Sequence, residues 1–154
     1  MDEAPHWLDP VEGRAWRGML RMHDLLANQT GRTLQREFGL SATDYSVLAE
    51  LTRAPEDRLR IQDLARVLGW EKSRVSHHLA RMTKRGLVGR EECPDDGRGA
   101  YVIVTRAGRE AIEAAAPRHV QDVRRLFLDH LTPGQIALLA EITGAVIAKN
   151  ENSQ

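Results

Sequence analysis

The stretch SRVSHHLARMTKRGLV, residues 73–88, decides how this sequence folds. A helix turns by about 100° per residue, so this stretch would carry an apolar stripe opposite a polar face. The stripe holds Val75, Leu79, Met82 and Gly86, and Gly86 is the expected end of the helix. The opposite face holds Ser73, His77, Arg81 and Lys84, with Arg74, His78 and Arg85 on one flank. The stretch therefore predicts a helix that packs through one side and exposes cationic, imidazole and hydroxyl groups on the other.

The two adjacent histidines do not predict a metal site, because neighbours on a helix diverge by about 100° whereas an i, i+4 pair shares a face. Nothing nearby supplies a nucleophile with an orienting partner, and the other histidines lack zinc-ligand spacing. We expect no catalytic residue, no metal, no cofactor and no enzyme activity. The exposed groups can donate to phosphate oxygens and base edges, or form an ordinary solvated surface.

The flanking residues predict a winged helix-turn-helix. LRIQDLARVLG, residues 59–69, indicates a short extended segment and then a helix closed by Gly69. After the basic helix, LVGREE and AYVIVT are two strand-like runs separated by the polar segment CPDDGRG, residues 93–99. A winged helix-turn-helix has the same order of elements, namely a short helix, a tight turn, a basic helix and a hairpin.

Longer helices are expected on both sides of this region. Residues 10–38 form one helix ended by Gly39, and a capping box of Ser41 with Asp44 opens the next. Thr105 caps a helix to about Leu131 that Pro117 should kink or interrupt. Thr132, Pro133 and Gln135 open the last helix. The fold class is mainly α with a small antiparallel β wing. A single domain, 1–154, would comprise a DNA-binding lobe, 41–105, and dimerisation helices, 10–38 and 106–150.

Composition supports a small soluble protein with one basic region. The 154 residues carry 22 basic and 22 acidic side chains, but residues 72–109 hold 9 basic and only 4 acidic ones. No apolar run approaches the ~20 residues of a membrane span, the N-terminus lacks the features of a secretory signal, and Cys93 is the one cysteine. We therefore expect a cytoplasmic protein without an intramolecular disulfide. The terminal helices carry more apolar side chains than one small lobe can cover, which favours a homodimer.

The segments LARVLGWEKSRVSHHLARMTKRGLVGRE and DDGRGAYVIVTRAGRE resemble the MarR family of bacterial transcriptional regulators. Asp96-Gly97-Arg98, the strand after it, and Thr105 with Gly108 match the wing pattern of that family. The resemblance implies a homodimer that binds a palindromic operator in double-stranded DNA, in many relatives as a repressor released by a small molecule. First and last helices would interlock, and two recognition helices would enter major grooves about 34 Å apart.

The resemblance also implies roles for individual residues. The positions that enter or flank the major groove are Ser73, Arg74, Ser76, His77 and Arg81. Arg74 would bind a guanine edge, and Lys84 and Arg85 would contact phosphates or solvent. In the wing, Arg98 would enter the minor groove, held by Asp96. Trp16, His23 and Trp70 could line an effector crevice, although such residues are more often core.

Two residues allow more than one interpretation. His78 occupies a position that is usually aliphatic in the family, so it is a buried histidine bonded to a neighbouring helix, a DNA contact or a proton-sensitive contact. Cys93 has acidic neighbours that oppose thiolate formation, which favours a structural over a redox role. A different class of function is a winged helix that docks a protein without reading DNA. Selectivity for a DNA sequence separates that module from a regulator.

Overall fold

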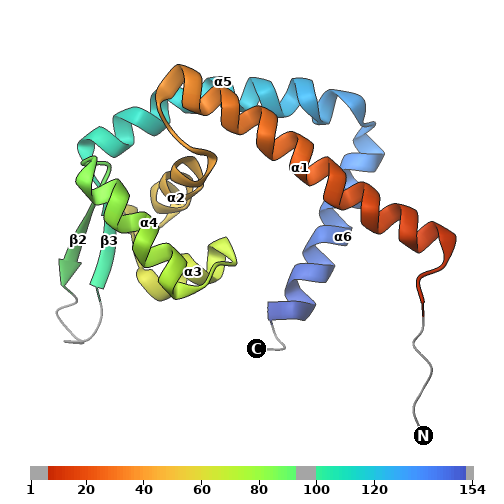
Figure 1. Ribbon diagram of the computed structural model, residues 1–154, viewed down its shortest axis with the longest axis horizontal. Coiled ribbons are helices and arrows are strands. Elements are labelled where there is room, and N and C mark those ends of the chain that lie inside the picture. Colours follow the sequence, from red (N-terminus) through yellow and green to blue (C-terminus); the bar gives the residue numbers. More distant parts are fainter. Residues whose placement is uncertain (1–6, 93–99, 152–154) are drawn as a thin grey trace, which may run out of the picture. The chain divides into compact units, whose positions relative to one another are not determined.

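The computed structural model describes residues 7–92 and 100–151, which form two compact units, Met1–His119 and Val120–Gln154. The first unit holds α1 (Pro10–Phe38), α2 (Ala42–Arg53), η1 (Pro55–Asp57), β1 (Arg58–Arg60), α3 (Ile61–Leu68), α4 (Lys72–Lys84), β2 (Val88–Glu92) and β3 (Ala100–Val104). It also includes the first part of α5 (Arg106–Leu126). The second unit holds the end of α5, then η2 (Leu128–His130) and α6 (Pro133–Glu151). Figure 1 shows α2, α3 and α4 gathered beside the β2–β3 hairpin.

Local side-chain chemistry sets where the helices begin. Capping boxes open three of them: Asp9 with Glu12 at α1, Ser41 with Asp44 at α2, and Thr132 with Gln135 at α6. In each box the two side chains bind backbone N–H groups that have no partner within the helix. The boxes expected at α2 and α6 are confirmed.

Glycines end three helices, as the sequence predicts. Gly39 after α1, Gly69 after α3 and Gly86 after α4 have φ values of 65°, 64° and 73°. These left-handed conformations cost glycine little and other residues more. At the end of α4, the backbone N–H of Leu87 donates to the carbonyl of Met82 across 3.0 Å. The turn at Gly86 thereby directs the chain into β2.

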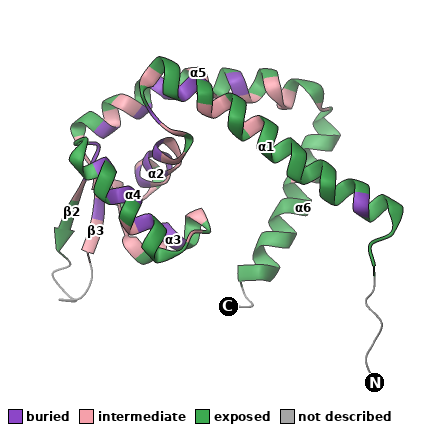
Figure 2. Ribbon diagram, viewed as in Figure 1, coloured by how far each residue is buried: buried purple, intermediate pink, exposed green. Residues whose placement is uncertain are grey.

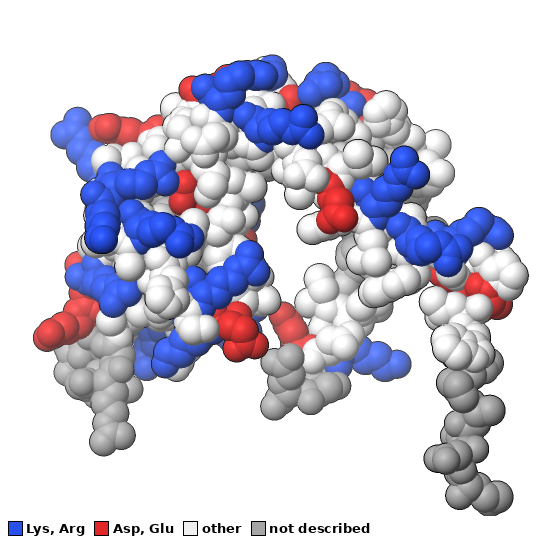
Figure 3. All heavy atoms as spheres, in the orientation of Figure 1, with Lys and Arg blue, Asp and Glu red and all other residues white. Residues whose placement is uncertain are grey.

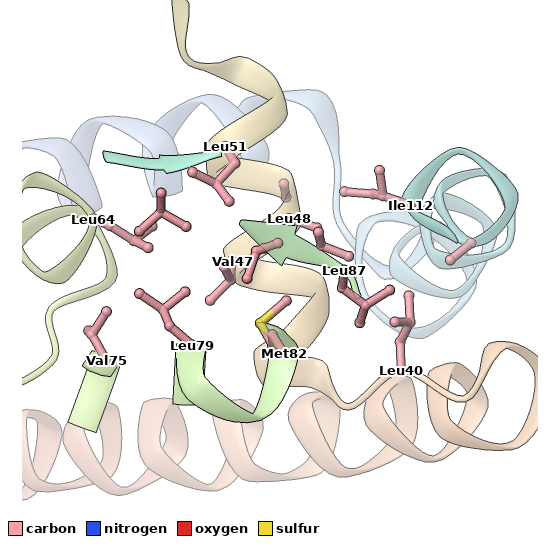
Figure 4. Close-up of a cluster of buried hydrophobic side chains, with 14 of the residues drawn as sticks. Leu40, Val47, Leu48, Leu51, Leu64, Val75, Leu79, Met82, Leu87 and Ile112 are labelled. Carbon is pink, nitrogen blue, oxygen red and sulfur yellow. The ribbon is translucent and has the colours of Figure 1, made fainter. Parts of the chain in front are cut away.

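The core of the first unit is built around α2. Val47, Leu48 and Leu51 of this helix are 0% exposed. Figure 4 shows them among apolar side chains of the neighbouring elements. The contributing residues are Leu40, Leu64, Val75, Leu79, Met82, Leu87 and Ile112. Because Val75, Leu79 and Met82 all come from α4, the apolar stripe predicted for that helix is confirmed.

The sheet has three strands in the order β1-β3-β2, and both pairings are antiparallel. β2 and β3 are the predicted hairpin. The short extended segment expected near Leu59 turns out to pair with β3, with Leu59 opposite Val102. β1 is only three residues long, too short for an alternation of apolar and polar residues that would predict a strand. It pairs because the edge of β3 offers free backbone N–H and carbonyl groups.

The Thr-x-x-Gly pattern fixes the junction between the sheet and α5. The hydroxyl of Thr105 donates to the carbonyl of Gly86 across 2.6 Å and accepts from the backbone N–H of Gly108 across 3.0 Å. A Cβ on Gly108 would collide with the carbonyl oxygen of Leu87. The glycine is therefore required because the start of α5 lies directly against the chain that leaves α4.

Helix α5 departs from its expected course. We predict a helix to about Leu131 that Pro117 kinks or interrupts, but α5 continues through Pro117 without interruption and ends at Leu126. Proline removes one backbone donor, and a carbonyl that loses this donor can bind water where the helix is exposed. Both Pro117 and Glu113, whose carbonyl loses that donor, are exposed. The short helix η2 follows instead of a last α-helical turn.

Figure 2 colours most of α1 and α6 as exposed, and many of these exposed residues have large apolar side chains. On α1 they are Val11, Trp16, Met19, Leu20, Met22 and Leu25. On α6 they are Ile136, Leu138, Ile142, Val146 and Ile147. Among the described residues, no single helix is long and apolar enough to cross a bilayer; α5 and α6 reach that length and composition only when counted together. Apolar surface of this extent marks a contact surface.

Replacing Gly108 by alanine should destabilise the protein by about 3 kcal/mol, because the added methyl forces the backbone of Leu87 away. Chemical denaturation measures the change. Gly31→Ala is the matched control: a Cβ there would make an ordinary 3.5 Å contact with Ala42 in the middle of α1. That change should be neutral or stabilise by about 0.5–1 kcal/mol. Equal stability of Gly108→Ala and wild type would disprove the close approach.

Candidate nucleic-acid interface

One side of α4 forms a polar surface that we term the reading face: Ser73, Arg74, Ser76, His77, Arg81 and Lys84. Five of these residues are exposed and Ser76 is half-buried. The opposite side of the helix is held in the core by Val75, Leu79 and Met82. Basic side chains gather over this part of the molecule in Figure 3. The division of α4 into a buried and an exposed face agrees with the sequence prediction.

The turn before α4 is tight and is closed by backbone hydrogen bonds. Gly69 ends α3, and the backbone N–H of Trp70 donates to the carbonyl of Ala65 across 2.9 Å. α4 then begins without a side-chain cap, and its first turn contains no acidic residue. Lys72 and Arg74 lie in this first turn, and the acidic Glu71 is the N-cap residue just before it.

Trp70 supports Arg74 directly. The guanidinium carbon of Arg74 lies 4.5 Å from the centre of the Trp70 ring, a cation–π contact. The Trp70 ring also meets the His78 ring edge-on, with centroids 6.1 Å apart. Arg74 is exposed, so the aromatic ring restricts its guanidinium without removing it from solvent.

Behind the reading face, a polar network joins α4 to α1 and α2. Arg85 donates to Oδ2 of Asp44 across 2.6 Å and to the carbonyl of Gly39 across 2.7 Å. On the other carboxylate oxygen, Oδ1, Asp44 faces Nε2 of His78 at 2.9 Å. Arg81 completes the network, with its Nη2 2.9 Å from Nδ1 of His78. The side chains of Asp44 and His78 are 3% and 9% exposed, so this network is largely shielded from water.

This network resolves the status of two residues. His78 is a buried histidine against a neighbouring helix, one of the interpretations that the sequence left open. Arg85 is not simply solvated, because its terminal nitrogens bind Asp44 and Gly39. Its side chain is still 45% exposed, so a phosphate contact stays a prediction. The long-range partner of Arg85 lies 41 positions earlier in the chain, which a helical pattern does not reveal.

The contacts within the network determine the protonation states of His78 and Asp44. Burial lowers the pKa of His78 below 6.5, and Arg81 acts in the same direction, while Asp44 acts to raise it. For Asp44, burial acts to raise the pKa, but hydrogen bonds from Arg85 and Ser41 and the charge of Arg85 lower it below 3.8. At neutral pH the network therefore contains an ionised Asp44 and a neutral His78.

Several predicted site residues lie elsewhere or beyond the described ranges. Asp96, Arg98 and Cys93 fall on residues 93–99 and lie outside the described residues. Trp16 and His23 are exposed on α1, and Trp70 is half-buried beside α4. Within residues 7–92 and 100–151, no group of three or more His, Cys, Asp or Glu side chains is placed to hold a metal ion.

Two cavities in the first unit are lined by residues other than the predicted crevice residues. One, of about 230 Å³, lies between α2 and α5 and is lined by Tyr45, Ala49, Thr52, Arg53, Arg109, Ile112, Glu113 and Ala116. The other, of about 440 Å³, lies behind α4 and is lined by Gln35, Gly39, Ser41, Asp44, His78, Arg81 and Arg85. The crevice of Trp16, His23 and Trp70 stays a prediction.

Comparisons with known proteins agree with this geometry. The sequence model of the MarR family matches residues 38–99. The chain is 37% identical to AbsC, a MarR family transcriptional regulator from Streptomyces coelicolor, with a TM-score of 0.88 over 97% of this chain and 100% of that one. It is 40% identical to Sco3205, a MarR family regulator from the same organism solved in complex with DNA, with a TM-score of 0.88 over 95% of this chain and 91% of that one.

A more distant relative is YkoM of Bacillus subtilis, an uncharacterised HTH-type transcriptional regulator, 28% identical over 60% of this chain and 58% of that protein. The chain spans about half the length of the curated relatives that it matches, 58% and 46%. The two structural matches cover 97% and 95% of this chain, whereas the curated relatives align over 60% and 50% of it.

Asp44→Ala should destabilise the protein by about 3 kcal/mol near pH 7, because it leaves His78 and Arg85 without their shared buried partner. Asp63→Ala is the matched control, since Asp63 also stands at the third position of a helix but pairs with Arg66 on the surface. That change should cost less than about 1 kcal/mol. Chemical denaturation at several pH values measures both.

The pH dependence has a defined sign. The pKa of Asp44 is lowered in the folded protein, so its contribution is present above pH 3.8 and is lost as the pH falls below 3.8 toward the folded pKa. The difference in stability between wild type and Asp44→Ala should therefore shrink on acidification through this range. A difference that is constant down to pH 2, or absent at pH 7, would contradict the network.

Proposed function

Because the chain belongs to the MarR family of transcriptional regulators, we propose that it binds a specific sequence in double-stranded DNA through the reading face of α4. The observation that carries the proposal is this face: a cationic, exposed side of the second helix in a helix-turn-helix, backed by a packed apolar stripe. Such a helix presents donors to the major groove while its other side holds it rigid. The regulator Sco3205 is known in complex with DNA and shares 40% identity with this chain.

The residues of the reading face take different roles in this proposal. Arg74 binds the O6 and N7 acceptors of a guanine, a pairing that its planar guanidinium suits. The contact with Trp70 orients Arg74 before DNA arrives. Ser73, Ser76, His77 and Arg81 contact bases or adjacent phosphates, and Lys84 contacts phosphate. In the wing, Arg98 enters the minor groove and Asp96 holds it, as the resemblance implies.

The target is a palindrome and the protein a homodimer. The apolar side chains of α1 and α6, such as Leu20 and Ile142, are exposed to water in a single chain. A second copy of the chain offers the same apolar surface and can bury them in a dimer interface. Two-fold symmetry places the two reading faces in major grooves about one helical turn, ~34 Å, apart. A cytoplasmic repressor that blocks transcription from such an operator is the form of regulation that we propose.

A small molecule that enters the cavity between α2 and α5 releases the DNA in this proposal. The lining of the cavity combines the buried apolar side chain of Ile112 with the polar groups of the half-buried Tyr45 and Arg109. α2 supplies Val47 and Leu48 to the core on which α4 rests, so a ligand that shifts α2 would also shift the reading face. A molecule with an apolar body and a polar end fits this lining.

Arg74→Ala should weaken binding by about 1–3 kcal/mol and relax base preference at one position in each half-site. The measurement compares the wild type and the variant on a duplex that wild type selects from a random pool, and on single-base variants of it. Glu71→Ala, a change just before α4, is the control and should keep the base preference. An equal loss on all sequences would make Arg74 a backbone contact. A wild type that selects no sequence would instead support the protein-docking module.

Ile142→Arg should shift the protein from dimer to monomer, because it places a charge in the apolar surface of α6. Sedimentation equilibrium measures the change. Val67→Arg is the control: Val67 is 52% exposed and Ile142 51%, but Val67 belongs to α3, which is not one of the proposed dimerisation helices. A wild type that is monomeric, or an Ile142→Arg variant that stays a full dimer, would remove α6 from the proposed interface.

A further inference from the structure

We infer that His78 is a positioning residue for DNA reading: its neutral ring holds the guanidinium of Arg81 at the reading face, and protonation of the ring releases that guanidinium. The inference rests on the proposed function, because Arg81 acts on DNA only if α4 does. It adds a titratable control to the reading face, whose other residues, His77 excepted, are cations or neutral hydroxyls.

The contact between Arg81 and His78 defines the state of the ring. Nη2 of Arg81 lies 2.9 Å from Nδ1 of His78. A guanidinium has donors and no acceptor, so Nδ1 must accept and must carry no proton. His78 is 7% exposed while Arg81 is exposed. A buried ring thus holds the guanidinium of an exposed arginine from behind.

The rest of the ring's surroundings are a carboxylate and an aromatic ring. Nε2 lies 2.9 Å from Oδ1 of Asp44, and the edge of the ring contacts Trp70. Asp44 is itself held by Arg85 and by the backbone N–H of Ser41 at 2.9 Å. The charged groups that face His78 are Asp44 from α2 and Arg81 and Arg85 from α4, and α1 contributes the uncharged Gln35 and Gly39 to the adjoining cavity.

Protonation would reverse the role of Nδ1. The new N–H would point at the guanidinium of Arg81 and place a second positive charge 2.9 Å from it. Asp44 faces Nε2 on the other side of the ring and already binds Arg85, so it does not restore the contact of Arg81. Loss of the acceptor frees the long Arg81 side chain, which must then be ordered again when DNA binds.

The direction of the pH effect follows. Burial lowers the pKa of His78 below 6.5, so the neutral ring prevails at pH 7.5 and the protonated ring forms as the pH falls below 6.5. DNA affinity should therefore fall as the His78 ring becomes protonated. His77 is exposed on the reading face. The experiment therefore uses a His77→Gln background, in which His78 is the one imidazole on α4.

The experiment measures the dissociation constant of a duplex selected from a random pool, at fixed ionic strength from pH 7.5 to 5.0, in the His77→Gln background. With His78 intact, binding should weaken about tenfold across this range. His78→Gln should bind within about twofold of it at pH 7.5 and show no pH dependence, because an amide offers an acceptor to Arg81 and a donor to Asp44 and does not titrate. Equal pH dependence in both proteins would overturn the inference.

A second pair of variants tests the coupling to Arg81. His78→Leu removes the acceptor and should weaken binding at pH 7.5 about as much as Arg81→Ala does, and combining the two should add nothing further. Additive losses would overturn the inference while leaving the proposed function in place. If the intact protein shows no preference for any duplex, the proposed function fails, and the inference fails with it.

A measurement on the unsubstituted protein does not depend on how well the variants fold. Nitrogen-15 NMR of the imidazole distinguishes a protonated nitrogen from a bare one. At pH 7.5 the His78 ring should show a bare Nδ1 and a protonated Nε2 in the absence of DNA. A proton on Nδ1 would overturn the inference, since that nitrogen could not then accept from Arg81.

Discussion

The packing of the apolar stripe of α4 into the core around α2 is the constraint on which the rest of the structure depends. Val75, Leu79 and Met82 are at most 1% exposed, and they occupy one side of α4. Burying three such side chains contributes several kcal/mol, at about 1.5–3 kcal/mol each. A rotation of α4 about its axis would expose this stripe and bury guanidinium groups. The apolar contact therefore determines which residues of α4 face outward.

Polar contacts then hold individual side chains of α4 in place, beyond the orientation that the apolar packing gives to the whole helix. Asp44 opens α2 through its capping box and also binds Arg85, so one carboxylate joins the start of α2 to the end of α4. Through His78 the same carboxylate is linked to Arg81, and Trp70 holds Arg74. The two arginines of the reading face thus have separate supports from behind. A protein that must place a guanidinium against a base edge benefits from side chains that are already oriented.

The sequence predicts the elements better than it predicts their long-range partners. Periodicity places α4 and its two faces, capping boxes place the starts of α2 and α6, and glycines place three helix ends, because each depends on residues within one or two turns. The pairing of β1 with β3 and the contact of Arg85 with Asp44 join residues more than 40 positions apart, and no local pattern encodes them. Pro117 does not interrupt α5, although proline inside a helical pattern predicts a kink or an interruption.

The central claim is that a two-fold pair of reading faces enters successive major grooves. Methylation protection at guanine N7, an atom in the major groove, tests it most directly on the selected duplex. The account predicts two protected segments related by two-fold symmetry, with centres about 10 base pairs apart, and loss of one guanine protection in each segment with Arg74→Ala. A duplex that is bound without protected guanines, or with one unbroken protected segment unaffected by Arg74→Ala, would contradict it.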